Sequence, residues 1–197
     1  MNYLGHLYFS GNDLQLMYAN LFGDFVKGSD LSNYPPVLRK GIQLHRKIDS
    51  YIDHHPKVNE LMHELYPFLP KVTGIAIDLI FDHLLASNWS KFHPLPYRQF
   101  LDQFYELEIS QRDGYTEEFH IFTLQLKRND WMIHYASREG LQKMCTGVGS
   151  KLSFPNALHI APELFDAHRE RMEGTFQLFM QDAIPHFENL RLEPNGL

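Results

Sequence analysis

The segment from residue 70 to residue 89 constrains the fold more than any other part of this chain. Its apolar side chains recur at helical spacing and cover nearly the whole circumference of the predicted helix, which is typical of a helix at the centre of a protein. Asp78 and Asp82 lie one turn apart among them. Because burial of an unpaired carboxylate is costly, this helix needs a cation or a proton beside the pair. We predict a metal ion there, since the nearby arginines lie on the outer face of another predicted helix.

The rest of the chain also shows helical periodicity, and convincing strand alternation is absent from the sequence. Residues 2–9 are expected to be a short helix or an extended segment. The other helical segments are bounded in part by proline and glycine; they are 13–27, 36–54, 56–66, 97–109, 115–135, 137–147 and 162–182. We therefore predict a single all-α domain over residues 1–197, a bundle of about eight helices.

Composition excludes several classes of protein. The chain has 18 Lys and Arg against 24 Asp and Glu, and its formal net charge of −6 argues against a general nucleic-acid-binding protein. No apolar run approaches the length of a membrane span, and no secretory signal pattern opens the sequence, so we predict a cytoplasmic protein without a membrane partner. The single cysteine, Cys145, excludes a disulfide framework and a cysteine-based zinc finger.

A polar stripe runs along the apolar face of the predicted helix 36–54. His45 lies in the middle of the apolar arc, Asp49 lies inside its edge, and Asp53 lies just outside it. Their spacing of i, i+4 and i+8 places all three on one side of the helix. A lone core histidine usually hydrogen-bonds a carbonyl group. A carboxylate one turn away and the aspartate pair of segment 70–89 favour a shared metal site over a buried ionic network without an ion.

Two further segments repeat this arrangement of polar residues among apolar ones. Asn20 and Asp24 lie on the predicted helix 13–27, and His6 lies in an apolar N-terminal segment. His83 points about 100° away from Asp82 around its helix, so it is not expected to bind the same ion. Carboxylate and imidazole ligands without thiolate favour Mn²⁺, Mg²⁺, Fe²⁺ or Zn²⁺ over copper or an iron–sulfur cluster. Such sites activate a water molecule that hydrolyses a phosphoester, so the spacing favours a metal-dependent hydrolase on a helical scaffold.

Four sequence motifs occur in a fixed order: MNYLGHL at 1–7, GDFVKG at 23–28, GIQLHRKID at 41–49 and DLIFDHLL at 78–85. Together they resemble the acyl-carrier-protein phosphodiesterase family, although residues 110–130 match it poorly. The resemblance implies an all-α, HD-domain-like fold and a divergent relative of the HD-type metal phosphohydrolases. It also implies Mn²⁺-dependent hydrolysis of the phosphodiester between 4′-phosphopantetheine and a serine of holo-acyl carrier protein.

The resemblance also assigns residues to the predicted site. The metal-binding candidates are His6, Asp24, His45, Asp49, Asp78 and Asp82, and the catalytic candidates among them are Asp24, His45 and Asp49. Acyl carrier protein is acidic, so its docking surface should be basic, and the outer face of segment 36–54 offers Arg39, Lys40, Arg46 and Lys47. That face could equally be a solvated helix surface. Two other functions stay open: an HD-like hydrolase of nucleotides or other small phosphoesters, and a non-catalytic protein that binds acyl carrier protein.

Overall fold

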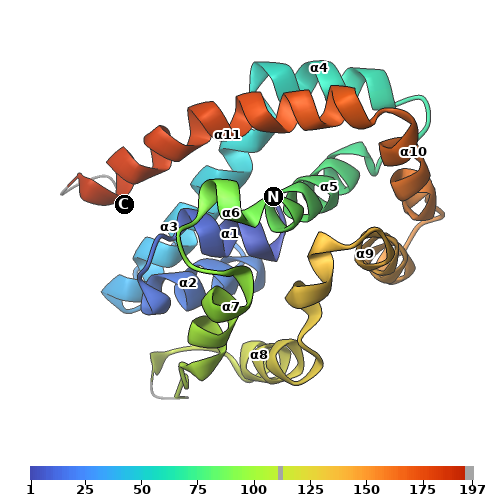
Figure 1. Ribbon diagram of the computed structural model, residues 1–197. Coiled ribbons are helices and arrows are strands. Elements are labelled where there is room, and N and C mark those ends of the chain that lie inside the picture. Colours follow the sequence, from blue (N-terminus) through green and yellow to red (C-terminus); the bar gives the residue numbers. More distant parts are fainter. Residues whose placement is uncertain (111–112, 194–197) are drawn as a thin grey trace.

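The computed structural model describes residues 1–110 and 113–193, and every regular element in these residues is a helix (Figure 1). This confirms the predicted all-α fold. The α-helices are α1 (Tyr3–Phe9), α2 (Leu14–Leu21), α3 (Pro36–His54), α4 (Pro56–Leu65), α5 (Thr73–Ser87), α6 (Trp89–Phe92), α7 (Tyr97–Glu106), α8 (Glu117–Asn129), α9 (Arg138–Lys151), α10 (Ala161–Ala167) and α11 (Arg169–Leu192). The 3₁₀ helices that lie wholly in the described residues are η1 (Phe22–Phe25), η3 (Trp131–Ala136) and η4 (Leu158–Ile160).

Three segments that the periodicity predicts as single helices are each divided in the structure. Segment 13–27 forms α2 and then the 3₁₀ helix η1, which carries Asp24. Asp130 adopts the left-handed conformation with a φ of 46°, so α8 ends there and η3 follows. At the C-terminal end, His168 separates α10 from α11, which then continues to Leu192 and contains Pro185. Apolar periodicity is similar on both sides of each break, and it therefore does not show where the backbone turns.

Helix α5 lies at the centre of the helical packing, as its apolar circumference predicts. It contacts α1, α4, α9, α10 and α11, and most of its side chains are buried. The ring of Phe81 packs against Phe176 and Phe179 of α11 with centroid distances of 5.3 and 5.5 Å. Figure 1 shows α11 crossing the molecule with α4 beside it, while α1, α2 and α3 lie together below α11, to the left of α5.

Helices α2 and α3 approach each other very closely at Gly41. A Cβ atom on Gly41 would lie 2.3 Å from the Cβ of Ala19, so only glycine permits this packing. The close approach brings η1, which follows α2 directly, against the side of α3 that carries His45. Within residues 1–110 and 113–193, no helix has both the length and the apolar character needed to cross a membrane.

Candidate metal centre

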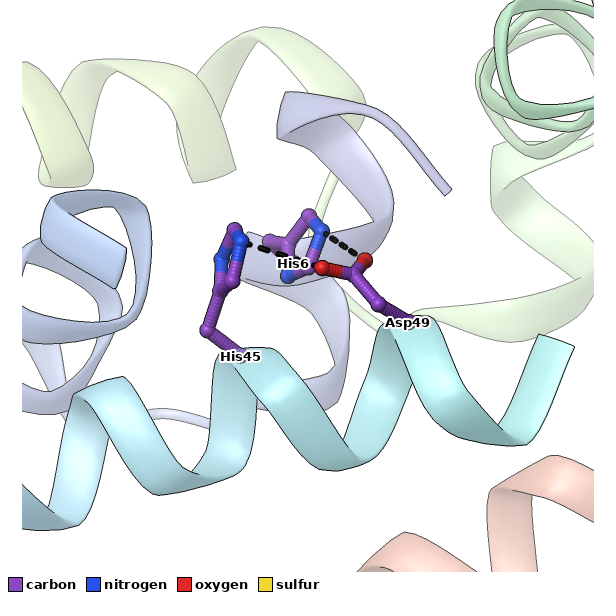
Figure 2. A group of neighbouring side chains, drawn as sticks. All are labelled: His6, His45 and Asp49. Carbon is purple, nitrogen blue, oxygen red and sulfur yellow. Dashed lines mark ion pairs between the residues drawn. The ribbon is translucent and has the colours of Figure 1, made fainter. Parts of the chain in front are cut away.

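Three elements bring two imidazoles and two carboxylates together. Helix α1 supplies His6, α3 supplies His45 and Asp49, and η1 supplies Asp24. The carboxylate of Asp49 reaches both imidazoles (Figure 2), with 3.2 Å from Oδ1 to His6 Nε2 and 3.1 Å from Oδ2 to His45 Nε2. Asp24 Oδ1 lies 3.4 Å from His45 Nε2. The two histidine rings are stacked, with centroids 4.1 Å apart and an interplanar angle of 14°.

The arrangement is closed on the histidine side and open on the carboxylate side. His6 and His45 are buried, with 2% and 5% of their surfaces exposed. The side chains of Asp24 and Asp49 are half-exposed, at 50% and 45%. Solvent and a substrate therefore reach the group from the side on which the carboxylate oxygens lie.

A glycine makes room for the His45 ring. A Cβ atom on Gly23 would lie 2.4 Å from Cγ of His45, far inside van der Waals contact. Because Gly23 immediately precedes Asp24, the same close approach sets Asp24 beside the imidazole. The glycine in the GDFVKG motif thus has a physical role at this site.

The electrostatics of the group distinguish the two histidines. Burial alone lowers the pKa of His45, but hydrogen bonds to Asp24 and Asp49 outweigh it and raise the pKa to about 9. Burial also lowers the pKa of His6, and the neighbouring His45 lowers it further. Against the effect of its own burial, the hydrogen bond with His45 lowers the pKa of Asp49. At neutral pH His45 is therefore the protonated imidazole and His6 the neutral one.

The structure gives Asp78 and Asp82 other partners than the predicted metal ion. Asp82 is fully buried and accepts hydrogen bonds from the backbone N–H groups of Leu4 and Gly5, at 2.8 and 3.0 Å. Asp78 Oδ1 lies 2.8 Å from the α-amino group of Met1. Desolvation raises the pKa of Asp82 to about 7, although the amino group and the two N–H groups act in the opposite direction.

These contacts attach the N-terminal end of α1 to α5 and leave the two carboxylates outside the cluster. Among the described residues, the group whose ligand atoms all lie within 4.8 Å of one another is His6, His45 and Asp49. The prediction of a metal ion beside the buried pair of α5 is therefore not supported by this arrangement. The sequence predicts that both carboxylates are buried; Asp82 is buried, but the side chain of Asp78 is 35% exposed. The sequence does not reveal that a backbone end meets them.

The basic residues predicted to bind a partner differ in their surroundings. Arg46 donates from Nη2 to the carbonyl oxygens of Gly28, at 2.5 Å, and Val26, at 3.5 Å, and so ties α3 to the loop that follows η1. Arg39 and Lys47 are exposed on α3, and Lys40 is partly exposed. Lys47 also lines a cleft of about 580 Å³ between α3 and α11.

Three other polar residues have separate environments. His83 donates from Nδ1 to the carbonyl oxygen of Tyr135 at 2.7 Å, in agreement with its predicted direction away from Asp82. Asp166 pairs with Arg138 and Arg169, at 2.7 and 3.1 Å. Asp53 is exposed one turn beyond Asp49, and partial burial together with the neighbouring Asp78 raises its pKa.

Comparison with known proteins assigns the chain to a family. The model of the family described as "Acyl carrier protein phosphodiesterase" matches residues 1–183. The chain belongs to this family. An acyl carrier protein phosphodiesterase of Klebsiella pneumoniae (strain 342) is 27% identical over 193 residues, which cover 98% of this chain and 100% of that protein. The protein of the same description from Escherichia coli (strain K12 / DH10B) is 28% identical over 180 residues, 91% of this chain and 93% of the relative.

No solved structure matches the chain. Family membership confirms the resemblance carried by the four motifs. His6, Asp24, His45 and Asp49 all lie within three of these motifs, and the structure brings all four side chains to one place. The relation to HD-type phosphohydrolases and the roles of the individual residues stay predictions.

Proposed function

We propose that this protein is a metal-dependent phosphodiesterase that releases 4′-phosphopantetheine from the serine of holo-acyl carrier protein. The observation that carries the proposal is a cluster of four side chains in a chain of this family, buried at its imidazoles and exposed at its carboxylates. The cluster consists of His6, His45, Asp49 and Asp24. The relatives named above are described as acting on acyl carrier protein. The absence of a membrane-spanning helix from the described residues is compatible with the cytoplasm, where we place the reaction.

The residues of the cluster fit a divalent cation. The nitrogen and oxygen donors of His6, His45 and Asp49 converge from two helices, and Asp24 adds a fourth oxygen at the open side. Two carboxylates face a single imidazole proton, so the site has an excess of negative charge that a cation neutralises. Oxygen and imidazole donors suit Mn²⁺, Mg²⁺, Fe²⁺ and Zn²⁺, and among these we propose Mn²⁺ because the family resemblance implies it. A bound ion of this kind lowers the pKa of water and polarises a phosphoryl oxygen.

The chain's own residues supply the acid and base groups. Asp24 is half-exposed at the open side, so its carboxylate can orient a water molecule and accept its proton. The water oxygen forms a bond to phosphorus while the bond from phosphorus to the serine oxygen breaks. The leaving serine oxygen needs a proton, and the proton that Asp24 accepts from the water can be passed to it. The products are the free serine of the carrier protein and 4′-phosphopantetheine.

The exposed basic residues of α3 supply a surface for an acidic partner. Arg39, Lys40 and Lys47 lie on the same helix as His45 and Asp49, so a carrier protein bound along α3 would keep its prosthetic group near the cluster. Charge pairing of this kind speeds association and weakens with added salt. We therefore assign the salt-dependent part of substrate binding to these three side chains.

The test is incubation of the protein with holo-acyl carrier protein and Mn²⁺, followed by measurement of the intact mass of the carrier protein. The proposal expects loss of the phosphopantetheine mass, dependence on added Mn²⁺, and no loss with the His6→Ala variant. Turnover of a nucleotide panel without turnover of the carrier protein would overturn the assigned substrate. Tight binding of the carrier protein without hydrolysis of any phosphoester would overturn the assignment as an enzyme.

A further inference from the structure

Asn20 lies behind the metal centre on α2 and is fully buried. Its side chain makes three hydrogen bonds. Nδ2 lies 3.0 Å from the carbonyl oxygen of His6 and 2.9 Å from Oγ of Ser10, and Oδ1 lies 2.9 Å from Nδ1 of His6. A buried amide with three partners on two neighbouring residues has little freedom to move.

The two partners of Nδ2 determine which way the amide faces. The carbonyl oxygen of His6 can only accept a hydrogen bond, and the hydroxyl group of Ser10 already donates to that same oxygen at 2.8 Å. A reversed amide would place Oδ1 against the carbonyl oxygen of His6, with two acceptors in contact. The NH₂ group must therefore face these two oxygens, and Oδ1 must face His6.

The orientation of the amide in turn determines which ring nitrogen of His6 carries hydrogen. Because Oδ1 of Asn20 only accepts, Nδ1 of His6 must be the donor. In a neutral imidazole the other nitrogen, Nε2, then has a bare lone pair. That lone pair lies 3.2 Å from Oδ1 of Asp49, so two acceptors face each other across the distance that a cation would bridge.

His45 has no equivalent support. Among the described residues its buried Nδ1 lacks a hydrogen-bond partner, while Nε2 faces the carboxylates of Asp24 and Asp49. The two stacked imidazoles of this site therefore differ in the hydrogen bonding of their Nδ1 atoms. The neighbours of His6 hold one tautomer, and the neighbours of His45 do not.

We propose that Asn20 is a positioning residue that holds His6 as the Nδ1–H tautomer and keeps its Nε2 lone pair turned toward Asp49 for a divalent cation. The inference rests on the metal site of the proposed function and deepens it. It also names a role that metal-binding histidines need, because a hydrogen bond at one ring nitrogen fixes the tautomer that binds through the other.

The direct test is ¹H–¹⁵N correlation spectroscopy of the imidazole rings in the metal-free protein, with His6 identified from a His6→Gln variant. Neutral His6 is expected to carry its hydrogen on Nδ1. An Nε2–H tautomer, or an even mixture of both, would overturn the proposal. This measurement uses the unaltered chain, so it stays decisive where a variant fails to fold.

The second test compares three variants by titration with Mn²⁺, followed by electron paramagnetic resonance of the free ion. Asn20→Leu removes the acceptor for Nδ1–H and is expected to weaken Mn²⁺ binding by about 10- to 100-fold. Asn20→Asp keeps an acceptor for Nδ1–H but places its second oxygen against the carbonyl oxygen of His6, so it should recover only part of the loss. Ser10→Ala is the matched control, because it removes a partner of Nδ2 and leaves the contact with Nδ1 in place; it should bind within about twofold of the unaltered chain.

The outcomes separate this inference from the proposed function. An Asn20→Leu protein that folds, keeps the Nδ1–H tautomer and binds Mn²⁺ normally would overturn the role of Asn20, whatever the substrate. A correct tautomer and weakened Mn²⁺ binding in Asn20→Leu would support that role even if holo-acyl carrier protein were not hydrolysed. In that case only the proposal that holo-acyl carrier protein is the substrate would be rejected.

Discussion

Helix α1 meets acidic side chains in two places, and the two contacts differ in what they leave available for chemistry. At its N-terminal end, Asp82 is fully buried and accepts the N–H groups of Leu4 and Gly5, while Asp78 pairs with the α-amino group. At His6, the half-exposed Asp49 faces imidazole nitrogens. Backbone N–H groups cannot release their hydrogen, so the first contact is complete as it stands.

An imidazole can lose its proton, and a cation can then take the proton's place between nitrogen and carboxylate. For this reason the second contact can bind a metal ion, although both contacts consist of aspartates on the inner face of a helix. The comparison teaches that the donor opposite an inward-facing carboxylate, together with the exposure of that carboxylate, separates a structural contact from a candidate metal site.

The largest effect is expected from Asp49→Ala. This change removes the carboxylate shared by both histidines, so hydrolysis should fall by about 10³-fold or more, and Mn²⁺ binding should be lost. Asp53→Ala is the matched control, because Asp53 is exposed one turn further along α3. Mass spectrometry of the carrier protein and Mn²⁺ titration measure both effects. Equal losses in the two variants would remove the distinction between Asp49 and its neighbour.

A smaller loss of activity is expected from Gly23→Ala. The added Cβ would lie 2.4 Å from the His45 ring and displace it. Misplacement of a catalytic group by about 1 Å lowers the rate by about 10²-fold. Gly174→Ala in α11 serves as the control, because nothing lies within 4 Å of its added Cβ. The rate of hydrolysis and the midpoint of thermal unfolding should both be measured. Normal activity in Gly23→Ala would show that the position of His45 is not critical.

Asp82→Ala tests the structural contact. The change leaves two buried N–H groups without an acceptor, so the free energy of unfolding should fall by about 2 to 4 kcal/mol. Asp82→Asn keeps an acceptor oxygen and should lose less. Urea denaturation measures the loss, and Mn²⁺ titration of the folded fraction should show nearly normal binding. A loss of Mn²⁺ binding as severe as in Asp49→Ala would place Asp82 in the metal site after all.

The smallest of these effects concerns pH. The pKa of His45 in the folded protein is about 9, above the value of about 6.5 for an unfolded chain, so its contribution to stability is complete below pH 6.5. This contribution is lost as the pH rises through 9. With a discount for the half-exposed carboxylates that hold the proton, the loss is about 1 to 2 kcal/mol.

Urea denaturation of the metal-free protein between pH 6.5 and pH 9 measures this dependence. The His45→Gln variant should show a flatter profile over the same interval. Mn²⁺ competes with the imidazole proton, and the stabilisation it provides should therefore increase with pH. A metal-free protein that becomes more stable over this interval would contradict the assignment of the proton to His45.

Much of the site follows from local periodicity. The spacing of His45 and Asp49 places both on the inner face of segment 36–54, and the structure shows them in contact through one helical turn. The apolar circumference of segment 70–89 correctly predicts the central position of α5. Helix geometry is local, so side chains three or four residues apart meet whatever the rest of the chain does.

Contacts between distant segments could not be predicted in the same way. Nothing in the periodicity indicates that Asn20 supports His6 or that Arg46 holds the loop after η1. The hydrogen-bond partners of Asp82 could not be predicted either, because almost every residue has a backbone N–H group and the sequence does not mark which of them will meet a side chain. The donor groups of a helix end become specific only when packing places that end against a particular side chain.

The sequence by itself determined that this protein is helical, that α5 is buried, and that His45 and Asp49 share one face. It also carried the four motifs of the family. Only the tertiary structure decided which aspartates among the apolar faces meet imidazoles and which meet the end of α1. The physical reason is that amphipathic spacing defines a direction around one helix axis, whereas a metal site requires donor atoms from separate helices within a few ångströms. That proximity depends on close approaches such as those at Gly23 and Gly41.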